Sequence, residues 1–333
     1  MTDVPAGRDE ELTFVTVVFD AEVLLLELQA RSMALFVDPS AVGAIIVLDN
    51  CVHGLSARQR RRLKVQYGFL WEKVAIVRAA TIIDAHAASG WRSQQAAKLA
   101  ISSRIETPHY VVLDAKNHFT RATGVAGFVA PDGRAHGALH SYAEHPLRPS
   151  LEQTMTYLGA DTTAIARAVD AYPPTATPFV FSTPLVRAMI DDVSERSGRR
   201  FDVEFERSGL LEFFLYSAWL DMRGPGIAGA IDGVSIPSPT VWPRLAHQLG
   251  VQAVVDESAR DDAFVFAVHR QALARSDAGT RRRIARHWSD VGLFAHERSA
   301  GRFIRGFRLA YGPAIVRTRL VERVRQRVRT WGA

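Results

Sequence analysis

The segment from Gly90 to Phe119 holds the polar residues whose types and spacing point most directly to ligand chemistry. A predicted helix carries Gln94, Gln95 and Lys98, and the strand that follows it ends at Asp114. Lys98 offers a compact positive charge that can reach phosphate groups, and a carboxylate at a strand end can hold a cation. We therefore expect this segment to form the centre of a ligand site.

Two further aspartates follow strand-like segments earlier in the chain. Asp20 comes after the run LTFVTVVF and Asp49 after AIIVL, and such apolar, β-branched runs are typical of buried strands. Because ligands of parallel sheets bind beyond the carboxyl ends of the strands, Asp20, Asp49 and Asp114 are expected at one edge. For Asp20 and Asp49, the competing interpretation is a helix cap or a turn residue.

The elements that must position these residues alternate between strand and helix. Strands are predicted over 12–19, 44–48, 74–77 and 110–113, and helices over 21–36 and 93–104. In the first helix, apolar residues such as Leu24, Leu28 and Phe36 can share one face. This alternation predicts an α/β fold, with a mainly parallel sheet flanked by helices.

Three residues elsewhere could serve the same site. Glu212 lies in the apolar run LLEFFLY of a helix predicted over 209–221, where burial would raise its pKa towards the range of a general base. A buried glutamate satisfied by arginine or by backbone donors is the alternative. His269 ends a buried strand and is either functional or structural. Trp91 could stack on a base or a sugar, or pack in the core.

The composition limits the class of protein. The 333 residues include 47% hydrophobic residues, enough for a full core, and a single cysteine, Cys51, which excludes an intramolecular disulfide. The polar start MTDVPAGRDEEL does not have the pattern of a secretory signal, and no apolar run reaches about 18 residues. We therefore expect a cytoplasmic protein.

The positive charge of the chain is concentrated at its end. Residues 302–333 contain nine arginines and one glutamate, a net charge of +8, whereas the whole chain carries +6 and the remaining 301 residues therefore carry −2. After Gly312-Pro313, apolar residues recur every three or four positions between arginines, which predicts a basic amphipathic helix. Such a helix could bind an acidic membrane surface, or pack on the domain with its arginines in solvent.

This charge distribution also separates two parts of the chain. We expect one domain over residues 12–297 and a basic helical extension over residues 298–333. Nucleic acid is not an expected partner, because a nucleic-acid-binding face should be basic within the domain itself.

Six stretches of the chain, taken together, carry a resemblance to a known family. They are AEVLLLELQARSM (21–33), GWRSQQAAKL (90–99), YVVLDAKNHF (110–119), TPFVFSTPLV (177–186), LLEFFLYSAWL (210–220) and FVFAVHR (264–270). The chain resembles a bacterial family of glycosyltransferase-like proteins of unknown function, often encoded among polysaccharide-biosynthesis genes. The resemblance implies a GT-A-like, Rossmann-related fold and a nucleotide-sugar donor.

The resemblance also implies a divalent metal, Mn²⁺ or Mg²⁺, bound by an Asp-x-Asp motif that clamps the diphosphate of the donor. This chain departs from that motif, because it has Asp114-Ala115-Lys116. A lysine in place of the second carboxylate would repel a divalent cation. Lys116 could therefore replace the metal by placing its own charge on the diphosphate.

Two other interpretations of the departure remain open at this point. Lys116 could point away, so that Asp114 and His269, with Asn117 or His118, hold the metal. Alternatively, Asp114 caps a turn and Lys116 is solvated. We count Lys116 and Asn117 among the residues that line the donor.

The resulting functional hypothesis is a glycosyltransferase that acts on a glycan or lipid-linked acceptor, at the inner membrane face or in the cytoplasm. Asp20 and Asp49 would contact the nucleoside. Glu212 would be the base that deprotonates the acceptor. If Glu212 instead lies far from the anomeric carbon, a mechanism that retains the anomeric configuration is open. The diphosphate would be lined by Gln94, Gln95, Lys98 and Asp114. The alternative is a non-catalytic relative that binds a nucleotide-sugar or glycan and has a degenerate metal motif.

Overall fold

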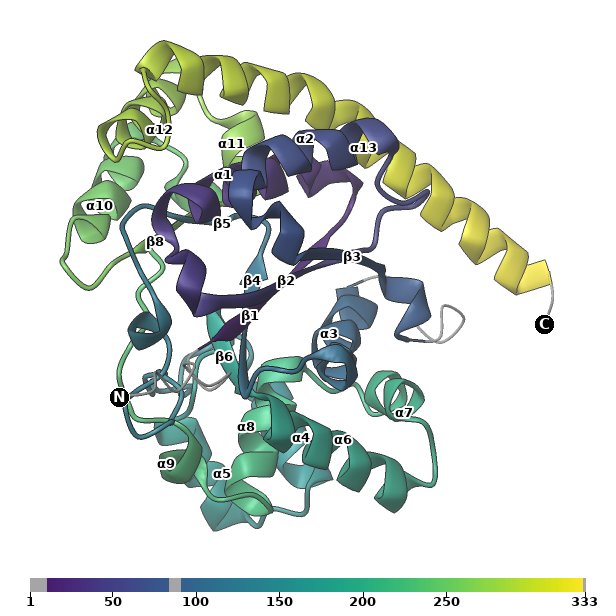
Figure 1. Cartoon of the computed structure of the whole chain (residues 1–333). Helices are drawn as coiled ribbons and strands as arrows, with labels where there is room; N and C mark the ends of the chain where they lie inside the picture. The colour runs from purple at the N-terminus through teal and green to yellow at the C-terminus, as the bar shows by residue number, and fades with distance from the viewer. Residues whose placement is uncertain (1–10, 84–90, 332–333) are drawn as a thin grey trace, which may run out of the picture.

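The computed structural model describes residues 11–83 and 91–331, with the side chains of residues 11–83 and 92–315. Its largest sheet has five strands in the order β3-β2-β1-β4-β6 (Figure 1). The strands are β1 (Leu12–Val18), β2 (Val42–Asp49), β3 (Val74–Arg78), β4 (His109–Asp114) and β6 (Phe179–Ser182). All neighbours are parallel except β4 and β6, so the predicted mainly parallel sheet is confirmed.

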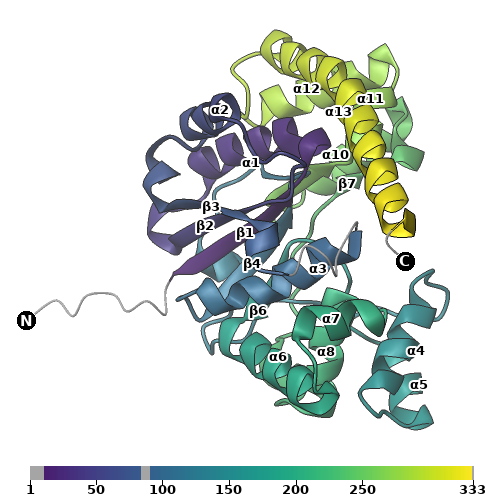
Figure 2. The ribbon, with the colours of Figure 1, turned by 90° about the vertical axis from the view of Figure 1, so that its right-hand side faces the viewer.

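The helices cover both faces of this sheet, as Figures 1 and 2 show. The helices on one face are α1 (Val23–Phe36), α2 (Ala57–Tyr67), α10 (Gln248–Ser258), α11 (Arg270–Arg275), α12 (Ala278–Asp290) and α13 (Glu297–Trp331). The helices on the other face are α3 (Trp91–Ala100), α4 (Arg148–Tyr157), α5 (Thr162–Asp170), α6 (Thr183–Ser197), α7 (Phe201–Arg207), α8 (Glu212–Met222) and α9 (Ile227–Ala230).

Alternation along the central strands builds two cores. In β1, Phe14 and Val18 pack into the core on the side of α1, whereas Val15 and Val17 pack into the core on the side of α3. Successive side chains of a strand point to opposite faces, so a central strand buried on both faces must be apolar along its length. This explains why the run LTFVTVVF shows no alternation of apolar and polar residues.

The register of the sheet brings the strand ends together. Val17 of β1 pairs with Asp114 at the end of β4, and Val18 pairs with Asp49 at the end of β2. The carboxyl ends of β1, β2 and β4 therefore meet at one edge of the sheet, as expected for parallel strands.

A second, three-stranded sheet continues from this edge. It has the order β5-β8-β7, with β5 (Asn117–Phe119) antiparallel to β8 (Val265–Val268), and β7 (Thr240–Val241) parallel to β8. The chain passes from β4 to β5 through Ala115 and Lys116 alone. The sequence analysis predicted the strand that became β8 but not β5 or β7, which are too short to show a period.

The C-terminal helix differs from its predicted form. Helix α13 runs without interruption from Glu297 to Trp331 and contains Pro313, where the sequence suggested a new start. Its first turns belong to the domain core, since Ile304 and Phe307 are each 1% exposed. Figure 1 shows the helix crossing above α1 and α2 and continuing past the sheet. No helix in the described part of the chain is both long and apolar enough to cross a membrane.

Candidate functional site

Two lysines enclose the carboxylate at the end of β4. The Nζ atom of Lys98, on α3, lies 3.3 Å from Oδ1 of Asp114, and the Nζ atom of Lys116 contacts Oδ2 of the same carboxylate. Burial opposes the ionisation of Asp114, but the charges of Lys116 and Lys98 outweigh it and hold the pKa of this carboxyl well below its usual range. Asp114 is therefore a permanent anion with an ammonium group on each oxygen.

Glu212 joins this cluster from the start of α8. Its Oε1 atom lies 3.2 Å from Nζ of Lys98, and both side chains are almost completely buried. Burial would lower the pKa of Lys98, but the charges of Asp114 and Glu212 raise it above its ordinary value. Burial also raises the pKa of Glu212, which Lys98 partly offsets. The predicted helix thus brings Glu212 to the same edge as Asp114, across 98 residues of sequence.

The turn that presents Asp114 and Lys116 is held by three buried side chains. Gln29 of α1 donates hydrogen bonds to the main-chain oxygens of Asp114 and Asn117, at 2.8 and 3.0 Å. The Asn117 side chain accepts from the Asp114 main-chain N–H, and the Thr177 hydroxyl lies within hydrogen-bond distance of Asp114 Oδ2. Asn117 therefore fixes the geometry of the turn, and its predicted contact with a donor stays a prediction.

A second ion pair lies beside the first cluster. Arg270, at the start of α11, donates to Glu22, which precedes α1, and its guanidinium lies 4.8 Å from the centre of the Phe19 ring. Burial raises the pKa of Glu22, and Arg270 opposes this shift. Val268, two residues before Arg270, donates a hydrogen bond of 3.4 Å to the Lys116 main-chain oxygen, so this pair lies next to the Asp114 cluster.

The small sheet adds an aromatic corner. Lys116 precedes β5, while Trp242 and His269 follow β7 and β8. Because β5 is antiparallel to the other two strands, all three residues lie at one edge of this sheet. The Lys116 ammonium lies 5.3 Å from the centre of the Trp242 ring, and the His269 ring lies 5.5 Å from it, centre to centre.

The predicted divalent metal does not fit this arrangement. Both oxygens of Asp114 already face ammonium groups, which would repel a dication. His269 caps α11 by accepting from Gln271 N–H, and burial lowers its pKa to about 4. No three His, Cys, Asp or Glu side chains of the described residues are arranged to hold a metal ion. The geometry gives no support to Asp114 and His269 as metal ligands.

His118, the other histidine considered for a metal, is a structural residue. It is 1% exposed, its Nε2 atom accepts a hydrogen bond of 2.8 Å from the Trp288 indole, and its Nδ1 atom lies 3.2 Å from the Lys116 main-chain oxygen. Burial lowers its pKa to about 3, so the ring is neutral. The hypothesis that His118 binds a metal is therefore wrong.

The two aspartates at the ends of β1 and β2 differ in their surroundings. Asp49 is completely buried and accepts from the N–H groups of Cys51 and Leu55, while Arg78 lies 3.1 Å away. These are the contacts of a turn residue. Asp20 is only half-buried and accepts one hydrogen bond, from Val52 N–H. A contact with a nucleoside remains a prediction for both residues.

Helix α3 places its glutamines differently. Gln95 is 1% exposed and its Oε1 atom accepts from the Glu212 main-chain N–H at 3.3 Å. Its Nε2 donor has no partner among the described atoms, and neither has the Nε atom of Arg270. Gln94 is half-buried on the same helix, and the side chain of Trp91 lies outside the described part. The site thus contains two buried donors without a partner.

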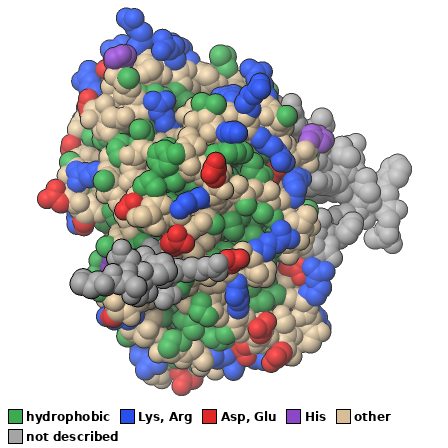
Figure 3. Space-filling view, viewed as in Figure 1, with side chains coloured by type: hydrophobic (Ala, Val, Ile, Leu, Met, Phe, Trp, Pro, Cys, Tyr) green, Lys and Arg blue, Asp and Glu red, His purple; other side chains and the backbone are tan. Residues whose placement is uncertain are grey.

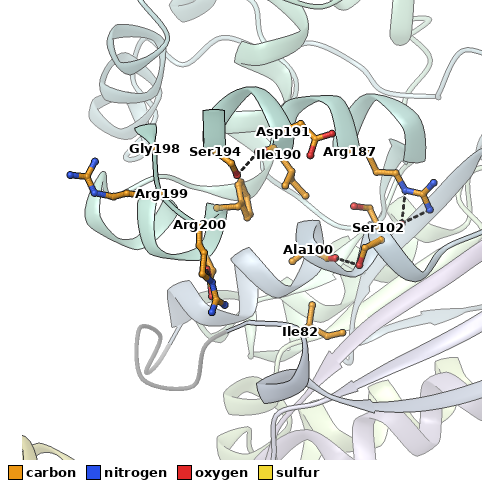
Figure 4. A pocket seen from close by; sticks show the side chains of 13 residues that line it. Ile82, Ala100, Ser102, Arg187, Ile190, Asp191, Ser194, Gly198, Arg199 and Arg200 are labelled. Atoms are coloured by element: carbon orange, nitrogen blue, oxygen red, sulfur yellow. Dashed lines mark hydrogen bonds and ion pairs between the residues drawn. The ribbon is translucent and has the colours of Figure 1, made fainter. Parts of the chain in front are cut away.

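A large cavity lies away from this cluster. It has a volume of about 880 Å³ and is lined by residues of α6 and α7 and of the segment after α3. Figure 4 shows Arg187 reaching Ser102 in this cavity, and Arg187 also donates to the Ile105 carbonyl. Its lining includes none of the four residues of the cluster, Lys98, Asp114, Lys116 and Glu212.

Several residues that shape the site were not predicted. Glu22, Gln29, Thr177 and Arg270 each lie within one of the six stretches that carry the family resemblance. Their roles depend on contacts between distant segments, which neither spacing nor residue type reveals. Trp242 lies outside those stretches and gave no signal.

The fold and this site define an α/β protein with a cluster of buried charges at the carboxyl edge of its sheet. The chain belongs to a family of unknown function, DUF6492, which residues 18–226 match. The predicted membership of such a family is confirmed. A comparison with curated proteins finds no match.

Solved structures of glycosyltransferases show a likeness to this chain. The galactosyltransferase LgtC, in complex with donor and acceptor sugar analogues, is 13% identical, with a TM-score of 0.43 over 84% of this chain and 96% of that one. An active-site mutant of LgtC is 13% identical, with a TM-score of 0.49 over 82% and 94%. The bifunctional glycosyltransferase WbbM is 13% identical, with a TM-score of 0.40 over 78% of this chain and 46% of that one.

Removing Lys98 should destabilise the protein through its partners. Lys98→Met leaves the Glu212 carboxylate buried without its counter-ion, which should lower the free energy of unfolding by about 3–5 kcal/mol. The double variant Lys98→Met/Glu212→Gln should recover most of this loss, because no unpaired charge remains. Urea denaturation measures the free energy of unfolding of both variants. A double variant as unstable as Lys98→Met would contradict the assigned pairing.

Proposed function

We propose that this protein is a glycosyltransferase that moves a sugar from a nucleotide-sugar to a glycan or lipid-linked acceptor. The observation that carries the proposal is the Lys98–Asp114–Lys116 cluster at the carboxyl edge of the sheet, where parallel sheets bind their ligands. The family resemblance seen in the sequence supports the same class of substrate. Residues 12–297 would form the catalytic domain, on which the first turns of α13 pack through Ile304 and Phe307.

The donor diphosphate would bind to the ammonium groups. An ammonium has three N–H donors; Lys98 uses two of them on Asp114 and Glu212, and Lys116 contacts Asp114. The remaining donors can face phosphate oxygens, and the unpartnered Nε2 of Gln95 is one more donor nearby. For the nucleoside we propose Asp20, since the carboxylate of Asp49 is enclosed by its own turn.

A charge from lysine would then do what a metal does in enzymes with two aspartates. Neutralising the leaving diphosphate lowers the barrier to sugar transfer, and a fixed ammonium can supply that charge without a cation from solution. The competing function is a non-catalytic protein that binds a nucleotide-sugar or glycan, and the observation that favours it is the poor fit of the site to a metal.

Donor binding should therefore not depend on a metal. UDP-, GDP-, CMP- and dTDP-linked sugars, tested by thermal shift in EDTA, should include at least one that stabilises the protein as strongly as with Mn²⁺. The variant Lys116→Asp restores two aspartates, so its binding of the same donor should require Mn²⁺.

Transfer or hydrolysis of that donor separates the two functions. Turnover by the wild type supports a glycosyltransferase, whereas binding without turnover of any donor favours the non-catalytic function. Stabilisation of the wild type only in the presence of Mn²⁺ would contradict the role given to Lys116.

Glu212 is the proposed base. Its burial raises its pKa, as a base that works near neutral pH needs, and its contact with Lys98 places it beside the proposed diphosphate site. The same contact allows another role, in which Glu212 only orients Lys98.

The variant Glu212→Gln distinguishes these roles. If Glu212 is the base, the turnover rate should fall by about 10²–10⁴-fold while donor affinity is kept, and the loss of wild-type activity at low pH should disappear. A parallel loss of donor affinity and rate would instead identify Glu212 as a residue that positions Lys98. Glu206→Gln, on α7, serves as a control for a neutralised glutamate elsewhere.

The acceptor side of the proposal includes an acidic membrane surface. Arg302, Arg305 and Arg308 are exposed along α13, and Figure 3 shows basic side chains along the upper part of the molecule, where α12 and α13 lie. Residues 316–333 add six arginines and one glutamate, a net charge of +5. Anionic lipids attract such segments by about 1 kcal/mol for each basic residue near the surface.

Truncation should begin after the buried turns of α13. A chain ending at residue 315 keeps Ile304 and Phe307, so its melting temperature should match that of the full chain. Its sedimentation with vesicles of phosphatidylcholine and phosphatidylserine should be at least about tenfold weaker, and pure phosphatidylcholine vesicles are the control. Equal binding by both chains, or retention by duplex DNA in place of lipid, would contradict a membrane role.

A further inference from the structure

Trp242 is an exposed tryptophan beside the Asp114 cluster. It follows β7 directly and is 41% exposed, whereas Val241 before it is completely buried. An indole that is exposed beside polar groups offers an apolar face on which a ligand can stack. The position lies beyond residues 18–226, so the matched family segment does not include it.

The indole is held in place. The Lys116 ammonium lies over its ring, 5.3 Å from the ring centre, and the His269 ring lies 5.5 Å away at an angle of 34°. His269 is itself fixed, because it caps α11, and Lys116 is fixed by Asp114. An aromatic ring held by two neighbours loses little conformational freedom when a ligand stacks on it.

Lys116 also joins the indole to an exposed carboxylate. The Asp114 side chain is 36% exposed, although the lysines on either side of it are only 9% and 13% exposed. A ligand that approaches this corner therefore meets the Asp114 oxygens and the Trp242 ring, with the ammonium groups behind them. An ionised carboxylate only accepts hydrogen bonds, so it selects a ligand that carries hydroxyl or N–H donors.

These two surfaces together match the chemistry of a pyranose. A sugar ring has one face of C–H groups that can lie on an indole, and hydroxyl groups at its rim that can donate to a carboxylate. A ligand without hydroxyl or N–H donors cannot hydrogen-bond to Asp114, so an anion alone would use only the ammonium groups. A nucleobase can stack but offers few donors.

We propose that Trp242 and Asp114 form a subsite for a pyranose ring, stacked on the indole and hydrogen-bonded to the carboxylate. This inference rests on the proposed function, because it assigns a place to a sugar of the transfer reaction. The ring belongs either to the donor or to the acceptor. Trp242 acts here as a binding residue and leaves the diphosphate contacts to Lys98 and Lys116.

The test uses simple sugars as probes. Methyl glycosides of glucose, galactose and mannose are titrated into ¹⁵N-labelled protein, and the Trp242 indole signal is identified as the one missing from Trp242→Phe. At least one glycoside should shift this signal. Saturation transfer to the same glycoside should weaken about tenfold in Trp242→Ala and be kept within about threefold in Trp242→Phe, which retains an aromatic face.

A matched control removes an exposed aromatic residue elsewhere. Phe69 is 62% exposed in the segment between α2 and β3, and Phe69→Ala should leave glycoside binding unchanged. Because Trp242 is exposed, Trp242→Ala should keep the melting temperature of the wild type. Uridine is the further probe: a shift of the Trp242 signal by uridine and not by any glycoside would overturn the pyranose assignment in favour of a base.

The outcomes separate this inference from the proposed function. If nucleotides and nucleotide-sugars bind and turn over equally in wild type and Trp242→Ala, and glycoside binding is unchanged, the subsite is wrong and the transferase stands. If glycosides bind through Trp242 while no nucleotide-sugar binds, the subsite stands and the transferase is wrong. A weaker affinity of Trp242→Ala for the nucleotide-sugar, but not for the free nucleotide, assigns the ring to the donor; a higher KM for acceptor alone assigns it to the acceptor.

Discussion

The contact between one carboxylate and two ammonium groups is the interaction on which the site depends. Asp114 ends a strand that is completely buried over Tyr110–Leu113, so its charge must be compensated close by. Lys98 and Lys116 provide that compensation, and Glu212 balances the excess positive charge on Lys98. Removing Lys98 leaves the buried Glu212 carboxylate without its counter-ion, which costs several kcal/mol. The cluster therefore holds α3, α8 and the β4–β5 turn in one arrangement.

The two sheets explain why this cluster forms where it does. In the large sheet, parallel pairing aligns the carboxyl ends of β1, β2 and β4, while helix α1 sends Gln29 to support the turn after β4. In the small sheet, the antiparallel β5 begins where β7 and β8 end, so Lys116 meets Trp242 and His269. A lysine in the turn between two sheets thus has one neighbour from each: the carboxylate of the first and the indole of the second.

The sequence predicted the framework of this protein better than its site. Apolar runs such as LTFVTVVF predict buried strands because burial on both faces requires apolar residues throughout, and the structure has these strands within a few residues of the predicted ends. Lys98, Asp114 and Glu212 were predicted to share a site, and the structure brings them into contact. Arg270 and Trp242 were missed, because only the small sheet, with strands of two to four residues, brings them to this edge. The sequence could not show that Asp49 is enclosed by its own turn, because an aspartate at a strand end can be a helix cap, a turn residue or a ligand-binding residue.

The identity of residue 116 decides what this edge can bind. With two carboxylates two positions apart, the edge would have a local negative charge that a divalent cation could neutralise. With Lys116 in the second position, the pair Asp114 and Lys116 is neutral, and Lys98 is in turn balanced by Glu212. No cation is then needed to balance the charge of the cluster, which keeps N–H donors for phosphate oxygens and an acceptor for hydroxyl groups. The same lysine steadies the Trp242 ring, so a single residue links the charge of the site to its aromatic face. A ligand that carries both phosphate oxygens and hydroxyl groups, such as the proposed nucleotide-sugar, would use both kinds of partner.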